Sequence, residues 1–354
     1  MYVHALGWNS YFQEQWDSLD RSHLRPARVA EEQRGAYHVA LEDGEWTAEV
    51  TGRFRHGAPD RSSFPSVGDW VAVETVAGER KAFIQALLPR RTRLSRKIAG
   101  ERSEEQILVA NVDTVFIVTS LNADLNPRRL ERYLTMVFES GAQPVILLNK
   151  ADLCSDANAA AVSISALAMT ADVHVVSALT GTGLGALNAY VARGATAVLV
   201  GSSGVGKSTI MNAMLQSGAQ KTAPIRDGDD RGRHATTFRR LYLMPAGGVL
   251  IDTPGLRELQ LWDADHVDEA FEDITTLAGG CRFRDCRHDG EPGCAVQEAI
   301  AIGALDEGRL ESLKKLQREL DHLDRRRDVA AQAEQRRRWK QIAKGLRQRP
   351  RGKP

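Results

Sequence analysis

The stretch GSSGVGKST, from Gly201 to Thr209, matches the phosphate-binding pattern G-x-x-x-x-G-K-[ST]. An apolar run, TAVLV, precedes it and a helix-forming run, STIMNAML, continues from it. Backbone N–H groups in such a glycine-rich loop close around phosphate oxygens, and the helix N-terminus adds a favourable dipole. We therefore expect a nucleoside triphosphate at this loop. The expected contacts are Gly201, Ser202, Ser203, Gly204, Val205, Gly206, Lys207, Ser208 and Thr209.

Two further stretches would complete the phosphate and magnesium site. Lys207 should reach the β- and γ-phosphates, and Ser208 should bind Mg²⁺. In GGVLIDTPG, Asp252 ends an apolar strand and should hold Mg²⁺ through water. The Gly255 amide should then contact the γ-phosphate.

The polar segment between these motifs, IRDGDDRGRHATTF, is expected to be a switch loop, although a plain surface loop would show the same composition. A switch loop needs a Thr that reaches Mg²⁺ and the γ-phosphate, and Thr236 and Thr237 are the candidates. We prefer Thr237. His234 is the candidate to position the attacking water or accept its proton, and ordering the loop or touching RNA are its alternative roles.

The motif NKAD, from Asn149 to Asp152, predicts a guanine-specific base site. Asp152 can accept hydrogen bonds from N1–H and the 2-amino group of guanine, two donors that adenine lacks. Asn149 would brace the purine edge, and the stem of Lys150 would cover the base plane. The pair Ser177-Ala178 ends another predicted strand and could offer a backbone N–H to guanine O6.

The order of these motifs along the chain is unusual. NKAD and the Ser-Ala pair precede the phosphate loop, whereas an ordinary GTPase begins with that loop. Because the termini of compact domains often lie close together, circular permutation can preserve a fold. We expect a permuted GTPase domain, with GAT at 194–196 as the new joint.

A Cys/His cluster follows, in the sequence CRFRDCRHDGEPGC. Its spacing, C-x4-C-x-H-x5-C, places three thiolates and one imidazole where they could hold a tetrahedral Zn²⁺ with no open position. The predicted ion is therefore structural rather than catalytic. The expected ligands are Cys281, Cys286, His288 and Cys294.

The elements expected around these motifs divide the chain into three regions. Short β-like runs with Gly, Pro and Asp between them predict a small β-barrel over 1–110, of the OB or SH3-like type. Alternating apolar runs and amphipathic segments over 111–260 predict a parallel α/β sheet. The remainder, 261–354, is expected to be helical around the Cys/His cluster, with an Arg-rich tail.

Composition limits the class of protein. A length of 354 residues accommodates two or three domains at roughly 100–200 residues each. No apolar run is long enough to span a membrane, and no signal peptide is recognisable, so we expect a cytoplasmic protein. Lys and Arg far outnumber Asp and Glu after Gly308 although the net charge is only +1, and this asymmetry suggests a nucleic-acid partner.

The motif order, the barrel and the zinc spacing together closely resemble the small ribosomal subunit biogenesis GTPase RsgA (YjeQ) family. The segments LPRRTRLSRK (88–97), NVDTVFIV (111–118) and GRHATTF (232–238) also resemble family segments. The resemblance covers essentially the whole chain. It implies an OB-fold N-terminal domain and GTP hydrolysis stimulated by the small (30S) ribosomal subunit. It also implies a role in late maturation of that subunit and contacts to ribosomal RNA.

Three features bear on this expectation. Ala235 stands where the family commonly has the first Thr of H-T-T-T, which leaves Thr236 and Thr237. Leu256 stands where Ras-like GTPases place a water-orienting Gln, so intrinsic hydrolysis should be slow. The basic run of Arg90, Arg91, Arg93, Arg96 and Lys97 could contact RNA phosphates or be merely solvated.

The expected activity is therefore hydrolysis of GTP to GDP and phosphate, by a monomer that acts on the small subunit and its rRNA. A GTP-switched RNA-binding module with incidental hydrolysis is the alternative. A GTPase that acts on another RNA is disfavoured by the zinc spacing.

Overall fold

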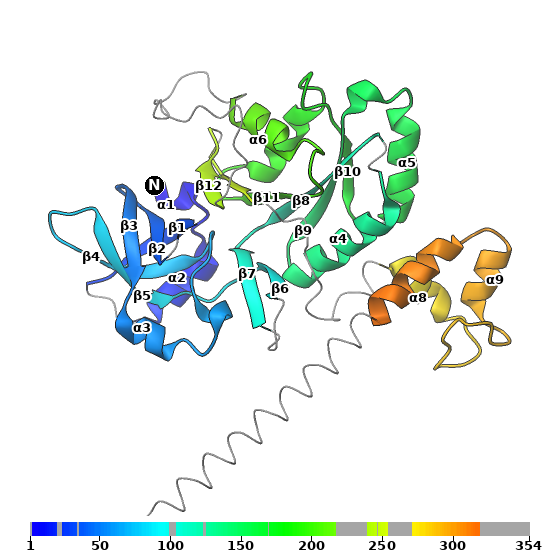
Figure 1. Ribbon diagram of the computed structural model, residues 1–354, viewed down its shortest axis with the longest axis horizontal. Helices are drawn as coiled ribbons and strands as arrows, with labels where there is room; N and C mark the ends of the chain where they lie inside the picture. Colours follow the sequence, from blue (N-terminus) through cyan, green and yellow to red (C-terminus); the bar gives the residue numbers. More distant parts are fainter. Residues whose placement is uncertain are drawn as a thin grey trace, which may run out of the picture.

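The computed structural model shows a barrel, a central sheet with helices and a smaller helical region, arranged along the chain (Figure 1). It describes residues 2–19, 23–33, 35–98, 104–122, 125–168, 170–216, 239–245, 247–253 and 271–318. Within these ranges, no helix is long and apolar enough to cross a membrane.

Five strands form the N-terminal barrel, which two short helices precede. The strands are β1 (Arg25–Gln33), β2 (Ala36–Leu41), β3 (Gly44–Val50), β4 (Trp70–Thr75) and β5 (Lys81–Leu87), and the helices are α1 (Tyr2–Ala5) and α2 (Ser10–Asp17). Hydrogen bonding runs β1-β2-β3-β5-β4 and returns to β1, and only the β3–β5 pair is parallel. This closure removes free sheet edges and is the topology of an OB-fold, so the first of the two barrel types expected is confirmed.

Three short elements complete the barrel region. The helix α3 (Gly52–Gly57) and the 3-10 turn η1 (Arg61–Ser63) connect β3 to β4. The side chains of Thr51 and Asp60 accept hydrogen bonds at their N-termini, from the N–H groups of Phe54 and Ser63. A hairpin of β6 (Arg93–Ile98) and β7 (Glu104–Ala110) then leads into the central sheet.

The central sheet has five parallel strands and one antiparallel strand. The parallel strands lie in the order β10 (Asp172–Val175), β9 (Gln143–Asn149), β8 (Thr114–Ser120), β11 (Thr196–Val200) and β13 (Val249–Asp252). The sixth strand, β12 (Arg240–Leu243), runs antiparallel to β13 and also pairs with β1, so hydrogen bonds join the central sheet to the barrel. Every residue of β8 and of β11 is buried, as expected for strands covered on both faces.

The helices of this domain are α4 (Pro127–Ser140), α5 (Ala157–Leu167) and α6 (Lys207–Gln216), with the 3-10 segments η2 (Ala151–Leu153) and η3 (Leu184–Val191). The sequence sets the ends of α4. Asn126 accepts a hydrogen bond from the Arg129 N–H, Pro127 occupies the first turn, and Gly141 ends the helix at a φ of 77°. The capping residues in the sequence therefore coincide with the ends of the helix in the structure.

The strand before the phosphate loop, β11, comes fourth among the five parallel strands along the chain. In the sheet, however, it lies in the middle, between β8 and β13. Val198 of β11 pairs with Val115 of β8 on one side and with Ile251 of β13 on the other. The chain therefore enters at β8, proceeds outward to β10, and returns to the centre at β11 through the joint at 194–196. This path is the predicted circular permutation.

One buried arginine connects the barrel to the central sheet. Arg28 of β1 is 1% exposed, and its guanidinium donates to the carbonyl oxygens of Leu6, Gly68 and Asn111 and to the hydroxyl of Thr196. These acceptors belong to the N-terminal segment, the barrel, the strand connection and the first residue of β11. Burial lowers the pKa of Arg28 to about 9, so the side chain remains charged at neutral pH.

The C-terminal region docks on α4 through a second buried arginine. It contains α8 (Glu272–Ala278), α9 (Ala295–Ala301) and a helical stretch at 307–318. Arg309 donates to Glu131 of α4 at 2.9 Å and to Asp273 of α8 at 2.7 Å. Its guanidinium also lies 5.0 Å from the ring centroid of Phe271. Arg309 thus pairs with one carboxylate from each of two helices, and Arg309 and Glu131 are both buried.

We predict that Arg28→Met lowers the free energy of unfolding by about 3 kcal/mol, because buried carbonyl oxygens lose their donor. Urea denaturation followed by tryptophan fluorescence measures the change. Arg25→Met is the control, since Arg25 pairs with Asp43 at the surface and should cost less than about 1 kcal/mol. Equal costs for the two variants would contradict the role given to Arg28.

Candidate functional site

The phosphate loop joins β11 to α6 and has a backbone that only glycine accommodates at two positions. Gly201 and Gly206 have φ values of 141° and 100°. A Cβ on Gly201 would lie 2.2 Å from the Val118 carbonyl oxygen, and one on Gly206 would lie 2.3 Å from the Asn149 amide nitrogen. The loop is therefore packed tightly between β8 and the end of β9.

Lys207 begins α6 and its side chain folds back across the loop. Its Nζ donates to the carbonyl oxygens of Gly201 at 2.7 Å and Ser202 at 2.6 Å. Ser208 and Thr209 are exposed in the first turn of α6, and Ser203 and Gly204 are exposed in the loop. Val205 is buried and anchors the loop from below. An ammonium group held at this loop is placed to bind phosphate oxygens.

Asn149 connects three loops that are far apart in the sequence. Its amide nitrogen donates to the Val205 carbonyl at 2.7 Å, and its oxygen accepts from the Ala178 N–H at 3.0 Å. Asn149 is 2% exposed. The base motif, the phosphate loop and the Ser-Ala loop are thus held as one unit by a single side chain.

Asp152 and Lys150 lie at the rim of this unit. The Ser177 hydroxyl donates to the Asp152 carboxylate and orients it. Lys150 takes the left-handed conformation, with a φ of 63°, where the chain turns into η2. These positions are consistent with a carboxylate that accepts from a base edge.

All these groups lie at the carboxyl ends of parallel strands. Asn149 ends β9, Ser177 follows β10, Gly201 follows β11, and Asp252 ends β13. Thr253 donates to the Leu199 carbonyl at 3.0 Å, which fixes the chain after Asp252 beside β11. Ligands of open α/β sheets bind at this edge, because the loops that follow the strands converge there.

The remaining predicted nucleotide contacts cannot be placed in the same way. His234, Thr236, Thr237 and Gly255 lie outside the described residues, as do Ala235 and Leu256.

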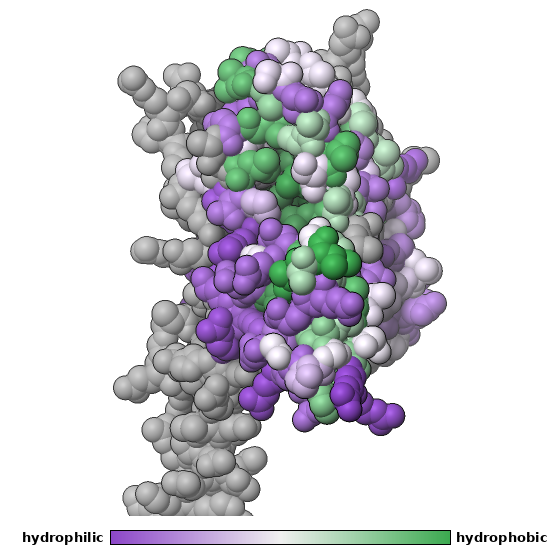
Figure 2. Space-filling view, turned by 90° about the vertical axis from the view of Figure 1, so that its right-hand side faces the viewer, coloured by the Kyte–Doolittle hydropathy of each residue, from purple (hydrophilic) through white to green (hydrophobic). Residues whose placement is uncertain are grey.

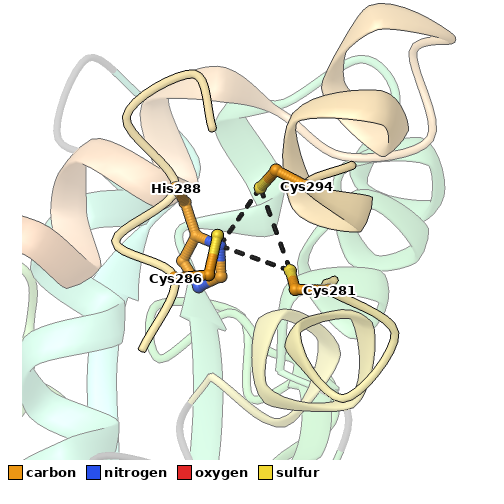
Figure 3. A group of neighbouring side chains, drawn as sticks. All are labelled: Cys281, Cys286, His288 and Cys294. Atoms are coloured by element: carbon orange, nitrogen blue, oxygen red, sulfur yellow. Dashed lines mark hydrogen bonds between the residues drawn. The ribbon is translucent and has the colours of Figure 1, made fainter. Parts of the chain in front are cut away.

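The four predicted metal ligands lie together in the C-terminal region (Figure 3). Ligand atoms of Cys281, Cys286, His288 and Cys294 are all within 4.8 Å of one another. His288 Nδ1 lies 3.3 Å from the sulfur of Cys294 and 3.7 Å from that of Cys281. Three sulfurs and one imidazole nitrogen facing a common centre form a closed site that could hold a metal ion.

The protonation chemistry of the cluster fits a cation. Burial lowers the pKa of His288, which favours the neutral imidazole that binds metals. Burial is also the main cause that raises the pKa of Cys286 to about 12, and the neighbouring sulfurs raise it further. Burial alone would raise the pKa of Cys281 too, but hydrogen bonds from the backbone N–H groups of Val296 and Ala295 lower it overall. A divalent ion held at the cluster would favour the thiolate form of its cysteines.

No sequence signal indicated the residues that support this cluster. Gln297 and Lys314 both donate to the His288 carbonyl oxygen, at 2.7 Å and 2.8 Å. They hold a residue whose φ of 58° is unusual for an L-amino acid. A lysine 26 residues beyond the histidine carries no spacing signal, so only the packing of the helical stretch at 307–318 reveals it.

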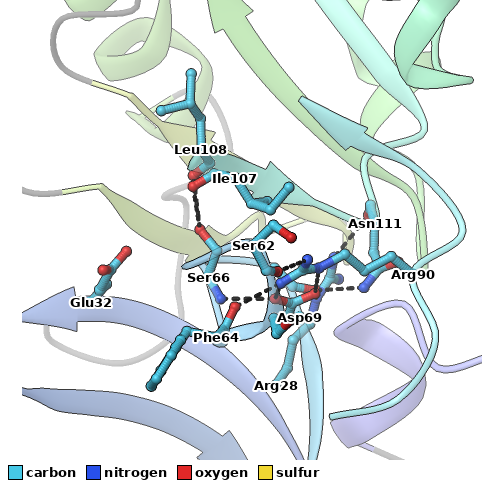
Figure 4. Close-up of polar contacts among 12 residues, drawn as sticks. Arg28, Glu32, Ser62, Phe64, Ser66, Asp69, Arg90, Ile107, Leu108 and Asn111 are labelled. Atoms are coloured by element: carbon cyan, nitrogen blue, oxygen red, sulfur yellow. Dashed lines mark hydrogen bonds and ion pairs between the residues drawn. The ribbon is translucent and has the colours of Figure 1, made fainter. Parts of the chain in front are cut away.

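The basic run after β5 differs from its predicted role at Arg90. Arg90 binds both carboxylate oxygens of the buried Asp69, at 2.8 Å and 2.7 Å (Figure 4). Arg91 pairs with Asp113, and Arg93 pairs with Glu105 at 3.3 Å. The expectation that Arg90 contacts RNA phosphates is therefore wrong, because its guanidinium is committed to the barrel.

Comparison with known proteins identifies the family. Residues 87–262 match the family described as RsgA GTPase. A relative from Opitutus terrae, named small ribosomal subunit biogenesis GTPase RsgA, is 45% identical over 99% of this chain and 98% of its own length. The chain belongs to the RsgA GTPase family. The resemblance inferred from the motifs is confirmed, and GTP hydrolysis is its reaction.

Other relatives agree with this assignment. An RsgA from Methanosarcina acetivorans is 48% identical over 79% of this chain and 76% of its own length. The crystal structure of YjeQ from Thermotoga maritima matches with a TM-score of 0.63 at 25% identity, covering 84% of this chain and 98% of YjeQ. YloQ, a circularly permuted GTPase, matches with a TM-score of 0.59 at 22% identity, covering 86% of this chain and 97% of its own.

We predict that the purified RsgA-family protein carries about one metal ion per chain and that Cys286→Ser loses it, because one of the four ligands is removed. Elemental analysis by plasma mass spectrometry measures the content. Cys154→Ser is the control, since Cys154 lies apart from the cluster. Full metal content in Cys286→Ser would contradict the ligand set.

Proposed function

We propose that this protein binds the small (30S) ribosomal subunit and hydrolyses GTP to drive or check its late maturation, with turnover stimulated by the subunit. The name shared by full-length relatives carries this proposal. An OB barrel joined to a nucleotide domain is a suitable arrangement, because OB-folds commonly bind RNA. The protein would act as a monomer in the cytoplasm, on rRNA of that subunit.

The residues at the carboxyl edge of the sheet would each have a different role in binding GTP. Asp152 would select guanine, with Asn149 holding the base loop and the Lys150 stem covering the base. Lys207 and the backbone N–H groups of the phosphate loop would neutralise phosphate charge. Mg²⁺ would be held by Ser208, Thr237 and Asp252, and it supplies charge compensation to the phosphate oxygens.

Hydrolysis needs a group that orients water, and Leu256 cannot do so by hydrogen bonding. His234 is the proposed residue for this role, placed in the segment between α6 and β12. Thr236, Thr237 and Gly255 would read the γ-phosphate from the same two loops. A slow enzyme of this kind suits a checkpoint, because the small subunit can then time the reaction.

The C-terminal cluster is proposed to hold one structural Zn²⁺. The Cys3His set suits zinc, since soft thiolates and imidazole are its preferred tetrahedral ligands. The division into a barrel at 1–110, a GTPase domain at 111–260 and a zinc-binding helical region at 261–354 stays a prediction.

We predict that small subunits raise GTP turnover by about tenfold or more, whereas large subunits do not. Phosphate release by the purified protein, alone and with each subunit, measures this, with ATP as the control nucleotide. Unchanged slow turnover together with GTP-dependent subunit binding would favour a GTP-switched RNA-binding module with incidental hydrolysis. Indifference to both subunits would exclude both functions.

We further predict that Asp152→Asn raises the KM for GTP by roughly 100-fold, because an amide cannot accept both guanine donors. The same variant should gain turnover of XTP, whose C2 carbonyl can accept from the new amide. Steady-state kinetics with both nucleotides measure the exchange. Asp156→Asn is the control, since Asp156 caps α5 and Asn caps equally well. An unchanged KM for GTP in Asp152→Asn would remove Asp152 from the base site.

A further inference from the structure

Four arginines lie where the barrel, the β6–β7 hairpin and the central sheet meet. Arg61 and Arg239 lie near Glu32, Arg96 lies near Arg239, and Arg55 lies near Tyr37, the cross-strand neighbour of Glu32. Arg55 comes from α3, Arg61 from η1, Arg96 from β6, and Arg239 from the residue before β12. We call these four the junction arginines. Arg239 lies 3.7 Å from the Glu32 carboxylate. They come from three parts of the chain that only the fold brings together.

The backbone arrangement explains why they converge. β12 pairs with β1 of the barrel, with Glu31 opposite Arg240, so Arg239 and Glu32 lie at the same level. The turn η1 lies beside β7, and Arg96 of β6 donates across the hairpin to Gln106 of β7 at 3.0 Å.

Negative charge at this place is insufficient for four guanidinium groups. Burial raises the pKa of Glu32, and Arg239 and Arg61 oppose that rise. Burial lowers the pKa of Arg239; Glu32 opposes this, while Arg96 and Arg61 lower it further. Arg239 therefore feels the repulsion of two other arginines against the attraction of one carboxylate.

Three nearby carboxylates of the barrel already pair with other arginines. Asp69 is bound by Arg90 and by the Ser66 N–H. Glu31 pairs with Arg240, which also reaches Glu45. These three acids are therefore committed elsewhere.

Some arginines near the junction already have acidic partners. Arg25 pairs with Asp43 at 3.0 Å, and Arg93 pairs with Glu105. Within the described part of the chain, Arg55 and Arg61 form no ion pair, and both are exposed. These two residues therefore bring unpaired positive charge to the junction.

The face of the molecule that carries α5 is apolar rather than positively charged. The helix α5 carries no charged residue, and Val162 on it is 71% exposed. Figure 2 shows hydrophobic side chains gathered in the upper part of this face, at the height of α5. A surface of that kind cannot neutralise phosphates, so a polyanion must bind elsewhere.

We propose that the junction arginines form a binding site for RNA backbone phosphates, placed so that one RNA segment bridges the barrel and the strand that follows the switch segment. This inference rests on the RNA partner of the proposed function. Guanidinium groups match phosphate oxygens with paired hydrogen bonds, and several around one carboxylate favour an incoming anion. A phosphate bound there also removes the repulsion between Arg61, Arg96 and Arg239.

The consequence concerns regulation of the GTP site. Arg239 directly precedes β12, which pairs with β13, and β13 ends at Asp252. RNA held at the junction therefore contacts the edge of the sheet that carries the magnesium site. Subunit binding and the state of the nucleotide become linked through this strand.

The test uses the full-length protein with Arg61 and Arg96 both changed to Gln. Binding to purified small subunits and to protein-free small-subunit rRNA is measured at several KCl concentrations. We expect the dissociation constant to rise roughly tenfold, and the slope of log K against log salt to fall by about 2, one for each lost phosphate contact. Basal GTP turnover without RNA should be unchanged.

Matched variants separate charge from structure. Changing both residues to Lys keeps the charge and should retain most of the salt slope. Arg25→Gln removes a partly exposed arginine that already has a partner, and should leave the slope unchanged. Thermal unfolding confirms that each variant is folded, as expected since Arg61 is exposed and Arg96 is partly exposed.

The outcomes distinguish this inference from the proposed function. If wild type and the Gln variant bind subunits equally with equal slopes, the junction site is wrong and the proposed function stands. If wild type prefers neither subunit but binds free rRNA in a manner that the Gln variant loses, the site stands and the proposed function fails. Loss of subunit binding with unchanged binding to free rRNA would assign the site to an acidic protein and overturn the phosphate proposal.

Discussion

The position of β11 between β8 and β13 is the constraint on which the site depends. A parallel strand in the centre of a sheet is hydrogen-bonded on both edges and covered on both faces, so its residues have little freedom. The loop that leaves its carboxyl end is therefore fixed in space. The position of the phosphate loop is therefore set by β11, and it does not depend on the order of the neighbouring strands along the chain.

This explains how the family tolerates a rearranged chain. Hydrogen bonds between β8, β11 and β13 form between residues that lie far apart in the sequence, and they require proximity rather than order. The joint needs only a short turn, which the Ala195 and Ala192 backbone groups close at 2.9 Å. Asn149 then reunites the base motif with the phosphate loop across the same edge. The permutation moves the free ends and leaves the site intact.

The same principle places the barrel and the C-terminal region. Arg28 and Arg309 each satisfy several acceptors from different parts of the chain inside an apolar contact, and each would be costly to leave unpaired. Such contacts define the position of one unit against another more sharply than apolar packing does, because hydrogen bonds are directional. They fix the positions of the barrel and the Cys/His region on the nucleotide domain. A structural change at the carboxyl edge of the sheet can then be transmitted to both the barrel and the Cys/His region.

The sequence by itself determined the elements whose signals are local. The glycines of GSSGVGKST, the spacing of Cys281 to Cys294 and the all-apolar strand runs each depend on neighbours close in the chain, and the sheet, barrel and metal cluster were predictable from them. The order of NKAD before the phosphate loop was sufficient to predict the permutation. What the tertiary structure decided was the use of individual charges. Arg90 and Arg61 look alike in sequence, yet one is bound inside the barrel by Asp69 and the other is exposed at the junction. Which carboxylate pairs with which arginine depends on strand register and on how the barrel and the central sheet pack together. Both are set by contacts between residues that are distant in the sequence.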